Sequence, residues 1–389
     1  MSDSVSMRPS EKVRAHLLQY QRQGRMTPGA RLPTADELAE TLGVSPGTVK
    51  NVYRALAAEG RVRTRVGAGS FWIGGEETPE VLRIGIGVEI AEPGEARWWK
   101  RDAWSGPVFG GILEGQLEHG PKVALESCPG LHGMSARQWA ARLETLDGVI
   151  FLSLRPLPVP LRDGRGRLVP HVTLNPPGEL VTANFVSPDY FESSYRLGEI
   201  WRQAGRRRVL MVTHVDLEDS PSTRLRYSGL LCGLGDAIGN PAQVRLFNVR
   251  AGEESVADRL GGFLRQGWVP DAIYTTGGAL VFDVMDALSA SGISVPESCC
   301  VVSGSGYDLT NFTGHLPVTT MIHPLAEVGR ALLAMLRRRI ASGGRDEPAL
   351  YLPVPFRIGN STSPEENERF TRYSRALLSG SPAPNADPL

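Results

Sequence analysis

The sequence predicts an α/β protein in two unequal parts: a small N-terminal domain of three helices and a β-hairpin, then a larger domain of parallel sheets covered by helices. Residues 1–75 contain eleven Lys and Arg against six Asp and Glu, whereas the rest contains 31 against 36. A polar Gly- and Pro-containing segment, GGEETPE, separates the two parts, and we place the linker at residues 76–80. The basic charge of the first part predicts a polyanionic partner for that part only.

Composition excludes several classes of protein. Hydrophobic residues make up 41% and charged residues 22% of the chain, as in ordinary globular proteins. No apolar stretch reaches the roughly 18 residues of a membrane span, and the N-terminus lacks the apolar run of a signal peptide, so we expect a cytoplasmic protein without a membrane partner. The cysteines lack metal-ligand spacing and are expected to be buried, reduced thiols. The histidines are scattered, and neither a metal nor another cofactor is expected.

Local capping signals place three helices in the small domain. The first covers PSEKVRAHLLQYQRQG, with Ser10 as the expected cap. The second begins with the capping-box pattern of Thr34 and Glu37 and ends near a glycine. The third begins at Ser45, with Pro46 in the first helical position, where its missing N–H costs nothing. Apolar residues spaced i, i+3, i+4 and i+7 in the third helix predict one buried stripe.

A β-hairpin follows, because apolar residues alternate with polar ones on both sides of the turn at Gly67-Ala-Gly69. Three helices, a tight turn between the second and third, and a hairpin constitute a winged helix-turn-helix. In that arrangement the third helix enters the DNA major groove and the hairpin meets the DNA backbone. Its non-apolar face carries small, hydrogen-bonding and cationic residues suited to phosphates and base edges. The candidate DNA-binding residues are Thr34, Ser45, Gly47, Thr48, Lys50, Asn51, Arg54, Arg65 and Gly67.

The segment RLPTADELAETLGVSPGTVKNVYRALAAEGRVRTRVGAGSFW resembles the DNA-binding domain of the GntR family, and the resemblance extends over residues 10–73. It includes the Leu-Pro before the second helix, the Leu-Gly-Val-Ser turn and the Gly-x-Gly wing. The resemblance implies double-stranded operator DNA as the partner. Asp36 and Pro46 stand where many members of the family have arginines that touch DNA. The operator sequence therefore does not carry over from the family.

Residues 81–362 alternate between strand-like and helix-like segments, which predicts parallel sheets with helices on both faces. There are too many strands for one small sheet, so we expect two α/β lobes. The order of LDGVIFL, RLGEIWRQAGRRRVLMV, SPSTRLRYSGL, PDAIYTT and LPVTTMIHPLAEVGRALLAML resembles the effector-binding domain of the LacI/GalR family. The resemblance implies the periplasmic-binding-protein fold, a homodimer and a sugar-like effector. A chain that combines these two domains resembles the arabinose-regulator subgroup of bacterial repressors.

The second resemblance implies several ligand contacts. Arg224 falls where the family places an arginine that holds ligand oxygens, with Ser220 beside it, and Asn175 matches a polar contact on the other lobe. Other positions depart from the family: Gly277 and Gly278 stand where sugar-binding members have Asn and Asp. The acidic residue expected after the strand CCVVS is also displaced, because Asp308 lies a few residues beyond the expected position. The loop after the first strand contains three tryptophans, which either stack on a sugar or pack against the lobe: Trp98, Trp99 and Trp104.

These patterns predict a ligand-responsive DNA-binding regulator, with repression as the commoner outcome in the resembling families. The alternative is an architectural or ligand-independent DNA-binding regulator with a degenerate pocket. An enzyme would need a nucleophile, metal or phosphate loop that the sequence does not display, and a transport-type binding protein would not carry a DNA reader. We further expect residues 363–389 to form a disordered tail, Arg206 to Arg208 to be a solvated strand edge, and the polar side of 334–340 to face water or a subunit partner.

Overall fold

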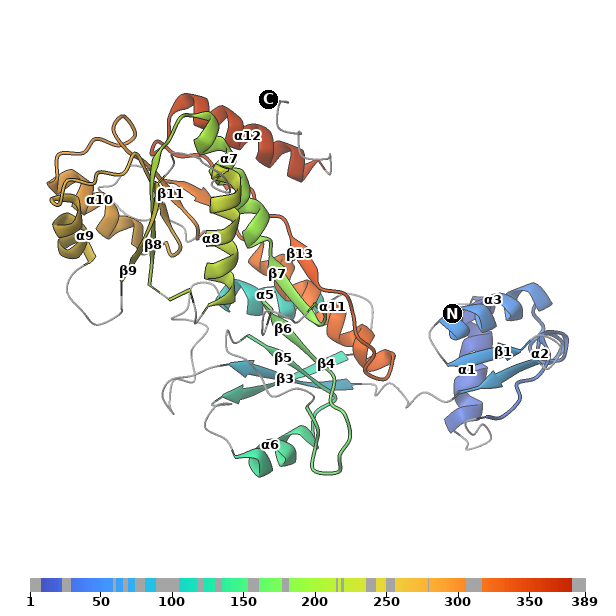
Figure 1. Cartoon of the computed structure of the whole chain (residues 1–389). Helices are drawn as coiled ribbons and strands as arrows, with labels where there is room; N and C mark the ends of the chain where they lie inside the picture. The colour runs from blue at the N-terminus through green and yellow to red at the C-terminus, as the bar shows by residue number, and fades with distance from the viewer. Residues whose placement is uncertain are drawn as a thin grey trace, which may run out of the picture.

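The small N-terminal domain has the predicted winged helix-turn-helix arrangement in our computed structural model (Figure 1). The structure describes residues 8–22, 29–58, 61–65, 69–73, 81–88, 105–117, 122–129, 135–152, 161–176, 182–214, 216–217, 220–235, 243–249, 256–278, 280–305 and 317–379. The linker at 76–80 lies outside these residues. The elements of the small domain are α1 (Pro9–Arg22), α2 (Ala35–Leu42), α3 (Pro46–Ala58), β1 (Val62–Arg65) and β2 (Gly69–Trp72).

The capping signals explain where these helices begin. Thr34 Oγ1 accepts the N–H of Glu37 at 3.3 Å, and the Glu37 carboxylate accepts the N–H of Thr34 at 2.7 Å, which completes the predicted capping box. Ser45 Oγ accepts the N–H of Thr48 at 3.1 Å at the start of α3. Ser10 is not the cap that the sequence predicts for the first helix, because α1 begins at Pro9 and Ser10 lies inside the helix.

The larger domain consists of two α/β lobes, each built on a six-stranded sheet, as predicted. The first lobe has the strand order β13-β7-β6-β5-β3-β4, and every neighbouring pair is parallel. Helices α5 and α11 pack on one face of this sheet, and α6 lies on the other side. Its elements are β3 (Val81–Val88), α5 (Ser105–Gly115), β4 (Lys122–Pro129), α6 (Ala136–Leu143), β5 (Gly148–Phe151), β6 (His171–Leu174), β7 (Phe185–Pro188), α11 (Leu325–Ala341) and β13 (Leu350–Leu352).

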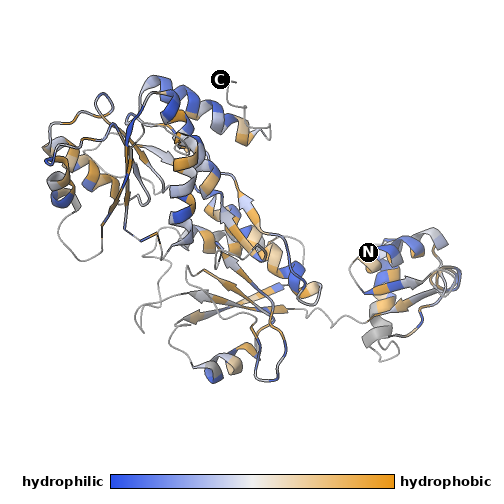
Figure 2. Ribbon diagram, viewed as in Figure 1, coloured by the Kyte–Doolittle hydropathy of each residue, from blue (hydrophilic) through white to orange (hydrophobic). Residues whose placement is uncertain are grey.

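The second lobe has the strand order β14-β12-β11-β10-β8-β9, which is parallel except for the pairing of β12 with β14. Helices α7, α8 and α12 cover one face, and α9 and α10 cover the other. Figure 2 shows the sheets of both lobes as mainly apolar. The elements are α7 (Tyr190–Gln203), β8 (Arg208–Thr213), α8 (Pro221–Leu234), β9 (Gln243–Asn248), α9 (Val256–Leu264), β10 (Ala272–Thr275), α10 (Leu280–Ala290), β11 (Cys300–Ser303), β12 (Thr319–Met321), β14 (Phe356–Arg357) and α12 (Pro364–Leu378).

The chain passes between the lobes three times: after β7, after β12 and after β13. Hydrogen bonds join neighbouring crossings. The N–H of Asp189, just before α7, donates to the carbonyl of Leu352 at 2.8 Å, and the N–H of Ile322 donates to the carbonyl of Pro355 at 2.8 Å. The crossings therefore lie side by side and form the connection between the two lobes.

The prediction of a disordered tail from residue 363 is wrong for the described part of that segment. Ser363 caps α12, and both bonds of its capping box with Glu366 are present. The apolar side of α12 contributes Phe370 and Tyr373 to the core of the second lobe. Residues 380–389 lie outside the described residues.

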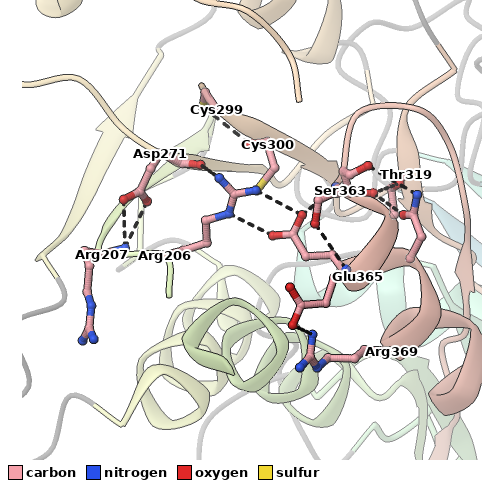
Figure 3. A network of polar contacts seen from close by, with 12 residues as sticks. Arg206, Arg207, Asp271, Cys299, Cys300, Thr319, Ser363, Glu365 and Arg369 are labelled. Carbon is pink, nitrogen blue, oxygen red and sulfur yellow. Dashed lines mark hydrogen bonds and ion pairs between the residues drawn. The ribbon is translucent and has the colours of Figure 1, made fainter. Parts of the chain in front are cut away.

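The prediction of a solvated edge at 206–208 is also wrong for Arg206. Its guanidinium donates to Glu366 through Nε at 2.9 Å and through Nη2 at 3.2 Å, and to the carbonyl of Asp271 at 3.2 Å. Figure 3 shows Arg206 between Asp271 and the start of α12. Burial raises the pKa of Glu366, but the bonds from Arg206 and from the backbone of Ser363 outweigh it and hold that pKa below its usual value.

Two further expectations need correction. Arg339 does not face water, because it is only 4% exposed and donates to the carbonyls of Gly344 and Arg345 and to Asp346 at 3.1 Å in each case. Its guanidinium also donates to the carbonyl of His171. Among the cysteines, Cys128, Cys299 and Cys300 are buried as expected, whereas Cys232 is exposed.

Candidate DNA-binding surface and effector site

The helix α3 presents most of the predicted DNA-binding residues on one exposed face. Its apolar stripe is buried in the small domain, while Gly47, Lys50, Asn51 and Arg54 are exposed and Thr48 is half-buried. Arg54 Nη1 donates to Asn51 Oδ1 at 3.0 Å, so the amide orients the guanidinium along the helix surface. Lys50 forms no ion pair with any described residue, which leaves its ammonium group available to a phosphate.

The remaining DNA candidates are placed less completely. Thr34 and Ser45 are exposed at the starts of α2 and α3, where their hydroxyls are engaged as caps. Arg65 is the last residue of β1, and Gly67 lies outside the described residues. The angle between α2 and α3 is fixed by Tyr53, whose hydroxyl donates to the carbonyl of Pro33 at 2.8 Å. Burial raises the pKa of Tyr53 to about 12, so the phenol stays protonated.

In the larger domain, polar groups gather where strands of both sheets end. In open α/β sheets, ligands bind beyond the carboxyl ends of the strands. Asn175 follows β6 in the first lobe, has a left-handed backbone (φ 66°) and is 6% exposed. It accepts a hydrogen bond from Ser187 Oγ at 3.0 Å, and it lies close enough to Tyr190, the first residue of α7 in the second lobe, to oppose the rise in the pKa of that phenol. Asn175 therefore lies at a junction of the two lobes.

The arginine at this junction is Arg226, which the sequence analysis missed. It belongs to α8, is 7% exposed and stacks over the ring of Tyr190 at 4.0 Å from the guanidinium carbon to the ring centroid. The guanidinium also lies close enough to the phenols of Tyr190 and Tyr274 to oppose the rise in their pKa values, and its buried Nε has no partner among the described residues. The Tyr190 ring in turn meets His323, from the second crossing, edge to face at 5.3 Å.

The hydrogen bonds described for the two predicted residues, Arg224 on α8 and Ser220 at its start, are with residues nearby in the chain. Arg224 is half-buried, and its Nη1 donates to the carbonyl of Leu217 at 2.6 Å. The Ser220 hydroxyl is the cap of α8 and bonds Thr223 and Ser222. A helix advances about 100° per residue, so Arg224 and Arg226 point to nearly opposite sides. Of the remaining candidates, Trp98, Trp99, Trp104 and Asp308 lie outside the described residues.

The electrostatics of the junction are set by burial and by Arg226. Burial, with the positive charge of Arg226 adding to it, lowers the pKa of His323 to about 3. Burial also raises the pKa values of Tyr190 and Tyr274, against the opposing effect of Arg226. At neutral pH all three side chains are therefore uncharged. The described residues contain no group of three or more His, Cys, Asp or Glu that could hold a metal ion.

Comparison with known families accounts for both parts of the chain. Residues 9–71 match the gntR family of bacterial regulatory proteins, and residues 200–362 match the periplasmic binding protein-like domain. The chain joins a gntR-type DNA-binding domain to a periplasmic-binding-protein-like domain. The gntR-type domain contains every predicted DNA candidate, and the second match ends where α12 is about to begin. In the described part of the chain, no helix is both long and apolar enough to cross a membrane.

A curated relative matches a short part of the chain. The HTH-type transcriptional regulator Rv1152 of Mycobacterium tuberculosis is 39% identical over 61 residues, which cover 16% of this chain and 50% of that protein. The chain thus spans about half the length of the curated relative it matches.

Solved structures share the fold of the larger domain. The lac repressor dimer bound to operator and the anti-inducer ONPF aligns with a TM-score of 0.55 and 18% identity, over 72% of this chain and 94% of that one. A LacI family regulator from Enterococcus faecium with bound ribose aligns with a TM-score of 0.54 and 18% identity, over 72% of this chain and 99% of that one. A LacI family regulator from Arthrobacter in complex with lactose aligns with a TM-score of 0.52 and 21% identity, over 72% of this chain and 100% of that one. These likenesses show the two-lobed fold.

Proposed function

We propose that the protein is a ligand-responsive transcription regulator: the gntR-type domain binds operator DNA, and the two-lobed domain binds a small-molecule effector that changes the affinity for DNA. The observation that carries this proposal is the presence in one chain of a DNA reader with an exposed cationic helix face and of a buried, incompletely bonded arginine between two lobes. The names of the similar proteins agree with it, since they are transcription regulators, some bound to sugars. A regulator of this kind acts in the cytoplasm and needs no catalytic group.

On DNA, α3 would lie in the major groove with its N-terminal residues nearest the bases. Lys50 suits a phosphate, because its ammonium group is exposed and unpaired, whereas the uncharged groups of Thr48 and Asn51 suit base edges. We propose a homodimer, because two readers must be held together to recognise half-sites one helical turn or a multiple apart. The lac repressor structure to which the larger domain is similar is itself a dimer bound to its operator.

In the larger domain we assign effector binding to Arg226 of the second lobe and Asn175 of the first, in place of Arg224. Both contact Tyr190, so an effector that reaches them touches both lobes and favours their closed arrangement. Closure moves the lobe that leads to the DNA reader, and in a dimer this changes the separation of the two readers. Effector and DNA affinities are then reciprocally coupled. Release of DNA, hence repression in the absence of effector, is the outcome we expect.

The DNA part of the proposal is tested by Lys50→Ala. Loss of one phosphate contact should weaken binding to every DNA sequence and lower the slope of log affinity against log salt by about one. The measurement is fluorescence anisotropy with upstream DNA fragments from 50 to 200 mM salt, about the range over which such slopes are resolved. Arg137→Ala, an exposed cation on α6, is the matched control. An unchanged slope for the Lys50 variant would remove α3 from the interface.

The effector part is tested by comparing Arg226→Gln with Arg224→Gln. Sugars and sugar acids are first screened by thermal shift, since a bound ligand raises apparent stability by mass action. A ligand that stabilises the wild-type protein and changes its DNA affinity should no longer do so with Arg226→Gln, while DNA binding itself survives. Arg224→Gln should keep the response. If no small molecule changes DNA affinity, the protein acts as a ligand-independent DNA-binding regulator and the proposal fails.

A further inference from the structure

We propose that α3 reads a guanine in each operator half-site, and that the hydrogen-bonded pair of Asn51 and Arg54 carries this preference. The inference rests on the DNA binding proposed above and specifies the base that the reader recognises. It begins with the positions of the two residues on the helix. An α-helix advances about 100° per residue, so residues at i, i+4, i+7 and i+11 form one row along its surface. In α3 such a row lies opposite the buried stripe, and its four members are exposed: Gly47, Asn51, Arg54 and Ala58.

The two ends of this row are small residues, which allows a base pair to come close to its centre. The fold does not require a glycine at position 47. Among the described residues, the nearest atom to a Cβ placed on Gly47 would be Ser45 Oγ at 3.8 Å, which is an ordinary van der Waals contact. Glycine also weakens a helix relative to alanine. A surface that approaches the helix closely, as the floor of the major groove does, accounts for the glycine.

The hydrogen bond within the pair fixes which atoms face outward. Arg54 Nη1 lies 3.0 Å from the side-chain oxygen of Asn51. A guanidinium has donors and no acceptor, so the amide atom that it meets must be the oxygen, and the amide NH₂ group is directed away from it. Side chains at i and i+3 are neighbours on a helix, so this arrangement forms before DNA binds. The pair therefore presents several N–H donors, and the amide oxygen already accepts a bond.

The major-groove edge of guanine fits this set of donors best. Guanine presents two acceptors, N7 and O6, whereas adenine presents the acceptor N7 beside the N6 donor. An asparagine by itself reads adenine, because its amide supplies one acceptor and one donor. The oxygen of Asn51 is engaged by Arg54, so the pair is matched to two acceptors. Cytosine presents a donor and thymine a single acceptor, which leaves guanine as the base with the most complete match.

The test selects binding sites for the full-length protein from duplex DNA with a randomised core. The wild type should enrich half-sites that share a guanine. Arg54→Met keeps the length of the side chain but removes its donors and releases the Asn51 oxygen, so this variant should select adenine at the same position. Asn51→Ala should discriminate less between bases there without selecting adenine. Lys50→Ala is the control, because loss of a phosphate contact weakens binding and leaves the base preference unchanged.

Base analogues in the selected duplex then identify the contacted edge. Replacement of the shared G·C pair by A·T should lower the affinity of the wild type about 5- to 150-fold, the worth of one bidentate base contact. 7-Deazaguanine, which lacks the N7 acceptor, should also lower the affinity. Inosine keeps N7 and O6 and should bind as well as guanine. Unchanged affinity for the 7-deazaguanine duplex would overturn the readout.

The outcomes separate this inference from the function on which it rests. Half-sites that share no guanine overturn the guanine readout, while a regulator that binds DNA stands. The same is true of a shared guanine that Arg54→Met and Asn51→Ala both select as strongly as the wild type does. Enrichment of no sequence at all contradicts the proposed function and the readout together. Both side chains are exposed, so the two variants should unfold at the wild-type Tm.

Discussion

Two arginines at opposite ends of the second lobe's sheet differ in what surrounds them. Arg206 lies just before β8, at the amino end, and the Glu366 carboxylate, whose side chain is 0% exposed, accepts two of its N–H groups. Arg226 lies at the carboxyl end and meets neutral tyrosines. The first charge is compensated within the fold and attaches α12 to the lobe. The second forms no ion pair with any residue in the described part of the chain.

The comparison shows why burial alone does not distinguish a structural arginine from a functional one. Both side chains come from the same lobe and are largely removed from water. A structural charge has its carboxylate partner and a full set of hydrogen bonds, because an unpaired buried charge destabilises a fold. A functional charge can retain an unsatisfied atom, because strain at a binding site is offset by the rest of the structure. Removal of the charge partner of Arg206 should therefore cost more stability than removal of the charge of Arg226.

The largest effect is expected at Glu366. Glu366→Gln keeps the capping box of α12 and the size of the side chain but removes the charge that faces Arg206. Breaking a buried ion pair on one side costs about 3–5 kcal/mol, and we expect a loss of that order in urea unfolding of the full chain. Glu365→Gln is the control, because the pair of Glu365 with Arg369 at 2.8 Å has a carboxylate side chain that is 65% exposed. Equal losses of unfolding free energy in both variants would show that the buried pair contributes no more stability than the exposed pair.

A smaller effect is expected at Arg226. Arg226→Met removes the buried charge and keeps most of the side-chain volume, while the Tyr190 ring loses the guanidinium that stacks over it. These contributions oppose each other, so the free energy of unfolding without effector should change by no more than about 1.5 kcal/mol in either direction, the worth of one ordinary hydrogen bond. The same urea unfolding measures it. A loss as large as that of Glu366→Gln would make Arg226 a structural residue and break the comparison.

Much of the fold could be predicted because its signals are local. Thr34 with Glu37 and Ser45 with Pro46 fix where α2 and α3 begin, and each acts within a few residues. The alternation of strands and helices likewise predicted two lobes. The start of α12 carried the same kind of signal, since Ser363, Pro364 and Glu366 form a capping box with proline in the first turn. The composition of the residues that follow it, SGSPAPNADPL, hid that signal.

The errors concern side chains whose partners are distant in the chain. Arg206 meets a carboxylate 160 residues away, and Arg339 meets a carbonyl 168 residues away, so neither burial follows from neighbouring residues. The choice between Arg224 and Arg226 depends on which side of α8 packs against α7 and the sheet. Gly233 shows how close that packing is, because a Cβ there would lie 1.9 Å from the carbonyl oxygen of Tyr195. The motif SPSTRLRYSG contains both arginines and does not reveal this rotation.

A further expected effect is a pH dependence of stability at the Arg226 end of the sheet. The folded pKa of His323, about 3, lies below its ordinary value of 6.5, so between these values the unfolded chain binds a proton that the folded chain does not. Stability therefore falls as the pH drops below 6.5, by at most about 1.4 kcal/mol per pH unit for one such group. The pair at the other end keeps its charge in this range, because the pKa of Glu366 is held below the ordinary 4.5.

Urea unfolding of His323→Gln between pH 7 and pH 5 should accordingly show a shallower loss of stability than the wild type. The Glu366→Gln variant, by contrast, should be offset downward by a constant amount over the same range, since its partner does not titrate there. Parallel curves for the wild type and His323→Gln would mean that His323 is not held neutral beside Arg226. A curve for Glu366→Gln that converges with the wild type toward pH 5 would mean that the α12 pair, and not the junction, controls the response to mild acid.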